Sequence, residues 1–170
     1  MDKAITTALL IVISMIMSVL LFNAVYPAVT QGSESITSMT NHVTERMRNQ
    51  IEIIHGAGEL DASGFWQDSN SNGEFDVFVW VKNIGDARIT PIEQADFFFG
   101  PEGNFVRIPY SASNGSGFPY WSYALENAAE WDPNATLKIT VHYGVPLGTG
   151  RYFAKLSTVT DAQAEYFMGM

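Results

Sequence analysis

The sequence contains no cysteine, and only nine of its 170 residues are lysine or arginine. Without cysteine, the chain can form no disulfide, no zinc–thiolate site and no cysteine nucleophile. The basic residues are scattered and are outnumbered by eighteen acidic ones, so the formal net charge is −9. Because nucleic-acid binding requires clustered basic side chains that neutralise phosphates, we expect no nucleic-acid partner.

The sequence also lacks the motifs of common catalytic sites. Its three histidines, His42, His55 and His142, are far apart in sequence and match no metal-binding or general-base pattern. No nucleophile elbow, P-loop or H-E-x-x-H motif occurs. A pair of catalytic carboxylates would leave no sequence signature, but nothing in the sequence indicates one. We therefore predict that the protein is not an enzyme.

Charged side chains are absent between Lys3 and Glu34. Within this gap, residues 4–29 read AITTALLIVISMIMSVLLFNAVYPAV. This stretch exceeds the roughly 20 apolar residues needed to cross a bilayer, and as an α-helix it would be about 40 Å long. Three interpretations are open. The first is a cleaved secretory signal, although the apolar region of such a signal spans only roughly 7–15 residues. The second is a simple membrane anchor. The third is a helix that enters the membrane and then packs with copies of itself in a filament.

The residues after the apolar stretch favour the third interpretation. Apolar side chains recur every three or four residues through 30–50, which is typical of an amphipathic helix. We therefore predict one long helix over residues 1–50, apolar in 4–29, with a kink or local break at Pro27. In a filament, the assembly contacts would come from the first half of this helix: Ile5, Leu9, Val12, Ile13, Ile16 and Leu20.

From about residue 50 the hydrophobic period changes to two. The segments 75–83 and 137–143 alternate, and 50–57, 95–100, 104–110 and 151–159 are further candidate strands, separated by glycine, proline and asparagine turns. The predicted fold class is α+β: a long N-terminal apolar helix followed by an antiparallel immunoglobulin-like β-sandwich over residues 51–170. The apolar tail AEYFMGM is expected to dock on its own domain or on a neighbour.

Residues 68–76 have the pattern D-x-N-x-N-G-x-x-D, which matches positions 1, 3, 5, 6 and 9 of an EF-hand-type loop. Position 12 is Val79, so a bidentate ligand would have to come from elsewhere. The alternative is an ordinary polar turn. We predict a structural Ca²⁺ ion as the cofactor, with these ligands: Asp68, Asn70, Asn72, Glu74 through its backbone carbonyl, and Asp76.

Two tripeptides fit the N-x-[ST] acceptor pattern for N-linked glycans. They begin at Asn114 and Asn134, and both fall in predicted loops of the β domain. Glycosylation at both asparagines is therefore a prediction.

The order of a long apolar helix and a β-sandwich resembles the archaellin superfamily, which comprises the subunits of the archaeal rotary filament and their relatives, archaellum proteins F and G. The matching segments are AITTALLIV (4–12), NAVYPAV (23–29) and VWVKNIG (79–85), with Arg88 and Ile89 after them. Family precursors carry a basic leader ending in glycine, whereas only three residues precede the apolar stretch here. The leader was either removed, or the chain is inserted without cleavage.

The resemblance implies membrane insertion, processing by a prepilin-type peptidase and helical assembly through the N-terminal helix. The predicted function is a structural subunit of an archaellum-type, type IV pilin-like surface filament for motility. Its partners would be copies of itself and membrane proteins of the archaellum motor or platform, and its location the cell surface. The alternative is a membrane-anchored stator protein like protein G or F, which the family implicates in anchoring the motor to the envelope.

Overall fold

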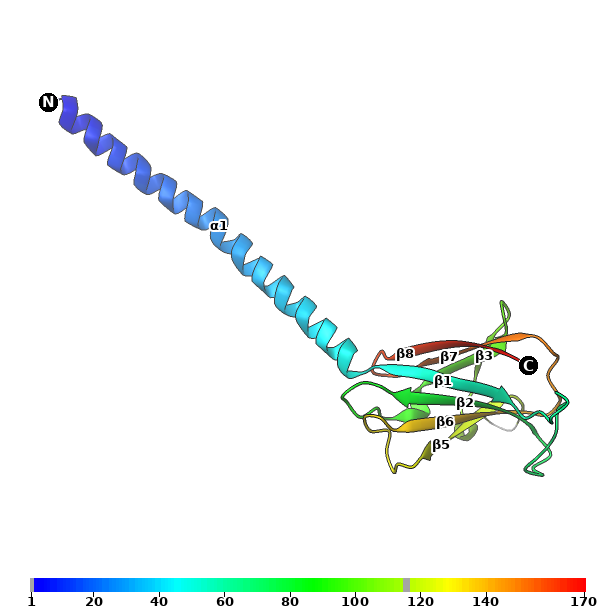
Figure 1. Ribbon diagram of the computed structural model, residues 1–170. Helices are drawn as coiled ribbons and strands as arrows, with labels where there is room; N and C mark the ends of the chain where they lie inside the picture. Colours follow the sequence, from blue (N-terminus) through cyan, green and yellow to red (C-terminus); the bar gives the residue numbers. More distant parts are fainter. Residues whose placement is uncertain (1, 115–116) are drawn as a thin grey trace. The chain divides into compact units, whose positions relative to one another are not determined.

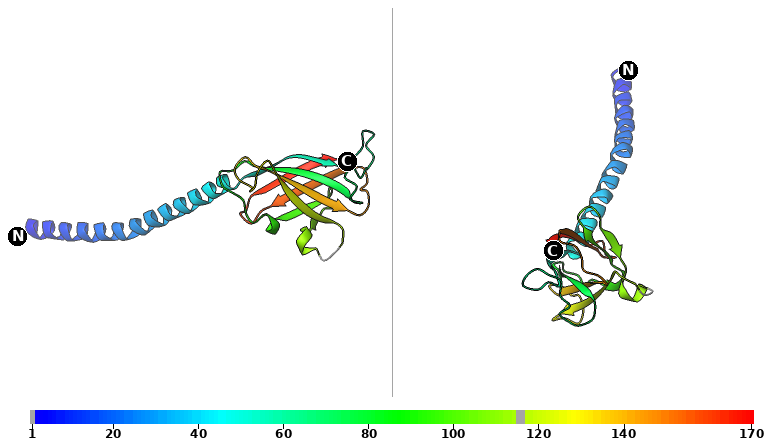
Figure 2. Two further views of the ribbon diagram at one scale, coloured as in Figure 1. Left: turned by 90° about the horizontal axis from the view of Figure 1, so that it is seen from below. Right: turned by 90° about the vertical axis from the view of Figure 1, so that its right-hand side faces the viewer.

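The computed structural model describes residues 2–114 and 117–170. The chain divides into two compact units, Met1–Thr44 and Glu45–Met170. Helix α1 spans Asp2–Arg48 (Figure 1). Pro27 lies inside this continuous helix, so the predicted local break is wrong. The helix curves along its length, as Figure 2 shows. Proline removes one amide donor from the helical ladder, and the hydrogen bonds on either side of that gap hold the helix together.

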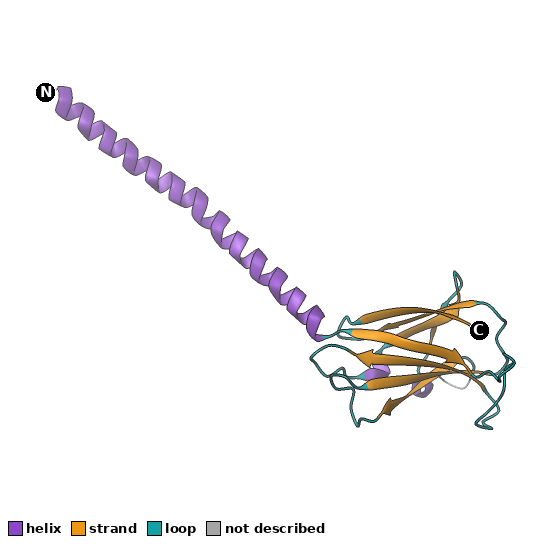
Figure 3. Ribbon diagram, in the orientation of Figure 1, coloured by secondary structure: helices purple, strands orange, loops and turns teal. Residues whose placement is uncertain are grey.

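The second unit is a sandwich of two four-stranded sheets whose ladders are all antiparallel (Figure 3), which confirms the predicted fold class. One sheet has the order β1-β2-β6-β5 and the other β4-β3-β7-β8. The strands of the first sheet are β1 (Ile51–Gly58), β2 (Phe75–Asn83), β6 (Thr136–Tyr143) and β5 (Tyr120–Glu126). Those of the second are β4 (Val106–Ile108), β3 (Asp96–Pro101), β7 (Arg151–Ser157) and β8 (Gln163–Gly169). Two 3-10 turns, η1 (Ile92–Gln94) and η2 (Ser111–Ser113), lie in the connections.

The core lies between the two sheets and is built by alternation along the strands. Every second residue in the middle of β2 and of β6 points inward and is fully buried, as the alternating pattern predicts. Opposite them, Phe97 and Phe99 of β3 are also fully buried. Two tryptophans complete the core, Trp121 on β5 and Trp131 in the loop before β6.

The structure contains two strands beyond those predicted from the sequence, and one predicted strand is shorter than expected. The segment Tyr120–Glu126 forms β5. Its alternating apolar residues Trp121, Tyr123 and Leu125 are the sequence feature that could have indicated this strand. The tail forms β8, which pairs with β7 and lies against β1, and so docks on its own domain (Figure 1). The predicted strand 104–110 is reduced to β4, because Pro109 cannot donate to a ladder.

Two residues of the V-W-V-K-N-x-G segment, Asn83 and Gly85, have a structural role at the end of β2. Asn83 is fully buried, and its Nδ2 donates to the carbonyls of Ala87 (2.8 Å) and Trp131 (3.1 Å), while its Oδ1 accepts the Gly85 amide (3.0 Å). A Cβ on Gly85 would lie 2.2 Å from the Arg48 carbonyl oxygen. Asn83 therefore fixes the start of the β2–β3 connection by hydrogen bonds, and Gly85 lets this connection pass close to the backbone of Arg48.

Candidate functional site

The apolar half of α1 has no protein partner within the described chain. The six predicted assembly side chains are 47–67% exposed: Ile5, Leu9, Val12, Ile13, Ile16 and Leu20. The helix is long and apolar enough to cross a membrane. Because so much apolar surface is costly in water, this half requires either lipid or neighbouring helices.

Three hydroxyl groups in the apolar half donate to carbonyls of the helix itself. Thr7 donates to the Lys3 carbonyl (2.8 Å), Ser14 to that of Leu10 (2.9 Å), and Ser18 to that of Ser14 (2.8 Å). A helix surrounded by hydrocarbon must satisfy its polar groups internally. These bonds therefore suit a helix in lipid, and they need no partner helix.

The predicted calcium loop precedes β2 and is closed by side-chain-to-backbone hydrogen bonds. The Asp68 carboxylate accepts the amides of Asn72 (3.1 Å) and Gly73 (2.9 Å). Asn70 Oδ1 accepts the amide of Asn72 (3.0 Å), and Asn72 Oδ1 accepts the amide of Glu74 (2.8 Å). The structure thus brings Asp68, Asn70 and Asn72 into one tight turn, with their oxygen atoms bonded to the backbone of the turn.

One acidic residue of this region was not expected from the sequence. Glu59 follows β1 and is buried, and its carboxylate accepts the Ser69 amide (2.7 Å) and the Ser69 hydroxyl. It also accepts the Asp76 amide at 3.4 Å. Glu59 therefore ties the predicted loop to the start of β2, although its sequence position gives no sign of this role.

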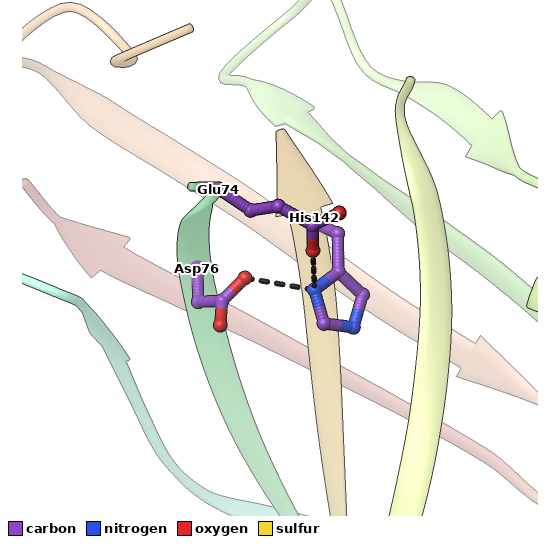
Figure 4. Close-up of side chains that lie close together, drawn as sticks. All are labelled: Glu74, Asp76 and His142. Atoms are coloured by element: carbon purple, nitrogen blue, oxygen red, sulfur yellow. Dashed lines mark ion pairs between the residues drawn. The ribbon is translucent and has the colours of Figure 1, made fainter. Parts of the chain in front are cut away.

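The side chains of the last two predicted ligands, Glu74 and Asp76, both contact a histidine outside the loop. Glu74 Oε2 and Asp76 Oδ1 each lie 2.8 Å from Nδ1 of His142, which comes from β6 (Figure 4). His142 is directly opposite Asp76 in the β2–β6 ladder. Asp76 Oδ2 accepts the side-chain amino groups of Asn70 (2.9 Å) and Asn72 (3.2 Å), so the histidine and the loop share this carboxylate.

Strand β5 supplies two neighbours of the histidine. The ring of Tyr120 stacks on His142 with centroids 4.6 Å apart, and its hydroxyl donates to Glu74 Oε1 (2.9 Å). Ser122 Oγ lies 2.8 Å from His142 Nε2. Burial, together with the hydrogen bond to Glu74, raises the pKa of Tyr120, which keeps its hydroxyl protonated as a donor.

We name Glu74, Asp76 and His142 the β2–β6 cluster. Sequence reasoning missed His142 because its contribution depends on which strand lies beside β2. The alternation of β6 places His142 on the outward face, where Asp76 also lies, but strand pairing is a tertiary property. Only the register brings the two residues together.

The two predicted glycosylation residues lie in loops. Asn134 is exposed in the turn before β6. Asn114 is half-buried and its Nδ2, the atom that would carry a glycan, donates to the Gly117 carbonyl. The other two residues of its tripeptide, 115 and 116, lie outside the described residues. Glycosylation remains a prediction at both sites.

No family model matches the chain. A protein from Archaeoglobus fulgidus described as uncharacterized is 24% identical over 128 residues, which cover 70% of this chain and 73% of that protein. Among solved structures, the archaellum periplasmic stator protein FlaG from Sulfolobus acidocaldarius matches with a TM-score of 0.54 at 20% identity, covering 71% of this chain and 99% of FlaG. The FlaF and FlaG stator complex from the same organism matches with a TM-score of 0.52 at 18% identity, covering 70% and 88%.

About 70% of this chain therefore shares the fold of FlaG. The similarity to the archaellin superfamily that the sequence predicts is thereby confirmed for the fold. The archaeal flagellin FlaB1 from Methanocaldococcus jannaschii also matches, at 13% identity over 72% of this chain and 90% of that one. Its TM-score of 0.48 is too low to support a conclusion about a filament role.

Proposed function

We propose that this protein is a membrane-anchored, non-catalytic component of an archaellum-type machine, whose β-sandwich lies on the envelope side and binds another envelope protein. The observation that carries the proposal is the pairing of a membrane-length apolar helix with a β-sandwich of the FlaG stator fold. The stator alternative thus becomes the preferred function, ahead of the filament subunit.

The helix supports anchoring in lipid. Its apolar side chains are exposed on all sides between residues 4 and 29, and its Ser14 and Ser18 hydroxyls are satisfied by its own carbonyls. A helix that is apolar all round needs lipid or a protein core around it. Lipid meets this need for a single copy, whereas a filament requires many.

The solved structures support a protein partner. One similar structure is a complex of two periplasmic stator proteins, FlaF and FlaG. We therefore infer that the partner of this β-sandwich is another envelope-side protein of the same machine, and that the chain does not polymerise with itself.

The filament subunit remains a second candidate, because the same exposed helix residues would pack in a filament core. The two candidates differ in what surrounds Ser14 and Ser18. In a filament, the small side chains would lie against a neighbouring copy. In a lone anchor, they would face lipid.

The absence of cysteine makes this difference measurable. We would introduce Ser18→Cys as the only thiol in the full chain, reconstitute it in lipid vesicles, and oxidise it. The anchor proposal predicts little disulfide-linked dimer, no more than for Thr37→Cys on the exposed polar half of the helix. Efficient dimer formation at position 18 alone would favour the filament.

Electron microscopy provides the second test. The full chain is purified in detergent, the detergent is removed in the presence of lipid, and the product is imaged in negative stain. We expect discrete particles in vesicles. Ordered filaments of the unaltered chain would overturn the anchor proposal, whatever the result of the thiol experiment.

A further inference from the structure

The β2–β6 cluster contains a buried carboxylate, one oxygen of which accepts no hydrogen bond from the described residues. Asp76 is 1% exposed, and its Oδ1 has no hydrogen-bond partner among the described residues. The same is true of Nδ1 of His142. In native proteins an unpaired buried polar atom is rare, because its desolvation is not repaid.

These two atoms lie 2.8 Å apart, which is an ion-pair distance. Nδ1 of His142 is 2.8 Å from both Asp76 Oδ1 and Glu74 Oε2. Both contacts are ion pairs when the imidazole is protonated. When the only ring proton is on Nε2, Nδ1 offers a lone pair, and neither Nδ1 nor Asp76 Oδ1 has a hydrogen-bond partner among the described residues. In that form the three atoms are all acceptors, and they lie within 4.8 Å of one another.

The convergence of two carboxylates requires a positive charge nearby. Within the described part of the chain, no lysine or arginine forms an ion pair with Glu74 or Asp76. Two carboxylates that share a poorly hydrated site repel each other unless a cation lies between them. A proton on Nδ1 of His142 would supply this charge, and so would a metal ion bound by the three side chains.

Neighbouring side chains hold the cluster in an orientation that suits a metal. Ser122 Oγ is within 2.8 Å of His142 Nε2, so an Nε2–H tautomer would present the Nδ1 lone pair to the cluster. Tyr120 donates to Glu74, and Asn70 donates to Asp76. Metal ligands in proteins are commonly oriented by outer hydrogen bonds of this kind.

We propose that Glu74, Asp76 and His142 bind one divalent transition-metal ion, with zinc as the preferred species. The three donor atoms lie within 4.8 Å of one another. An imidazole and two carboxylates suit zinc, whereas calcium takes oxygen ligands. At ion–ligand distances of about 2.1 Å, tetrahedral ligands are about 3.4 Å apart, so each of the two carboxylate oxygens must lie about 0.6 Å farther from Nδ1 than its present 2.8 Å.

The ion would act as a structural clamp. It joins β2 to β6 directly, and Tyr120 and Ser122 extend the connection to β5. Through Asp76 it also reaches Asn70 and Asn72 of the preceding loop. This site shares Glu74 and Asp76 with the predicted calcium loop but uses His142 and not Asp68. It does not depend on the proposed function.

The test uses the full chain in detergent micelles and ZnCl₂ as the probe. Isothermal titration is expected to show one saturable zinc ion per chain, and zinc at about 100 times its Kd should raise the melting temperature of the β domain by at least about 5 °C. His142→Gln and Asp76→Asn should each weaken zinc binding at least about 100-fold, and Tyr120→Phe about 10-fold.

The matched control is His55→Gln. His55 is exposed on β1 and stacks on Trp80, so it offers an imidazole outside the cluster. Zinc binding should be unchanged in this variant. Asp68→Asn should likewise leave zinc binding unchanged, because Asp68 belongs to the loop alone. If either variant lowers zinc affinity as much as His142→Gln, the proposed ligand set is wrong.

A measurement on the unaltered chain avoids any folding defect in the variants. In a histidine-labelled sample, a small amount of Mn²⁺ should broaden the ring resonances of His142 while leaving those of His55 sharp. Uniform broadening of both rings, or the absence of saturable zinc binding, would overturn the proposal. The three side chains would then form an ion pair within the protein and no metal site.

Discussion

The two units of this chain are both rich in apolar residues, yet they differ in whether those residues are exposed or buried. In Met1–Thr44 the described apolar side chains are exposed, whereas in Glu45–Met170 residues such as Val79 and Ile139 are fully buried. The reason is geometric. A single helix has no second layer against which to bury its surface, while two sheets cover one another. Apolar composition alone therefore does not tell which residues form a core.

The largest expected effect concerns the core. Trp121→Ala removes a fully buried side chain from between the sheets and should lower the free energy of unfolding of the β domain by about 3–5 kcal/mol. Urea unfolding of the full chain in detergent, followed by near-ultraviolet circular dichroism, measures this. Phe65→Ala, at a side chain that is 72% exposed, should change the value by no more than about 0.5 kcal/mol. A loss below about 1 kcal/mol for Trp121→Ala would contradict the assigned core.

The next effect concerns the helix. Ile13→Lys places a charge in the middle of the apolar half and should disfavour membrane insertion by about 2.5–3.5 kcal/mol, without changing the melting temperature of the β domain. Vesicle flotation measures the membrane-bound fraction. Leu20→Lys should behave alike, and Thr37→Lys in the polar half should leave flotation unchanged. Equal flotation of all variants would mean that the apolar half is not the anchor.

A smaller effect concerns the end of β2. Gly85→Ala would force a Cβ against the Arg48 carbonyl and should destabilise the β domain by about 1–3 kcal/mol. Gly148→Ala is the matched control, because a Cβ there meets nothing within 4 Å. Thermal unfolding of the two variants gives the comparison. If both melt alike, the close contact at Gly85 can relax at no cost.

The smallest expected effect concerns the predicted calcium loop. Calcium at about tenfold its Kd should raise the melting temperature of the unaltered chain by roughly 3–6 °C, and Asp68→Asn should abolish the shift. Asp61→Asn is the control. Asp61 also accepts two loop amides, from Ser63 and Phe65, but lies outside the predicted pattern. A melting temperature insensitive to both calcium and chelator would remove the calcium prediction.

Local patterns predict most of the elements. The alternation in 75–83 and 137–143 predicts β2 and β6 and their buried faces, because a residue's side in a strand follows from its position. Strands β5 and β8 escape prediction, since β5 lies among aromatic and polar residues and β8 has the composition of an apolar tail. The pattern in 68–76 predicts a calcium loop, with an ordinary polar turn as the alternative. The segment forms a tight turn closed by Asp68, and calcium binding stays a prediction.

The sequence by itself determined the presence of an apolar membrane-length helix, the alternating strands and the absence of thiol chemistry, since these follow from the order of residues along one segment. Only the tertiary structure decided that Asp76 faces His142, that Glu59 holds the loop, and that the tail closes the second sheet. These contacts join segments that are far apart in sequence, and strand order and register, which no local period encodes, determine them.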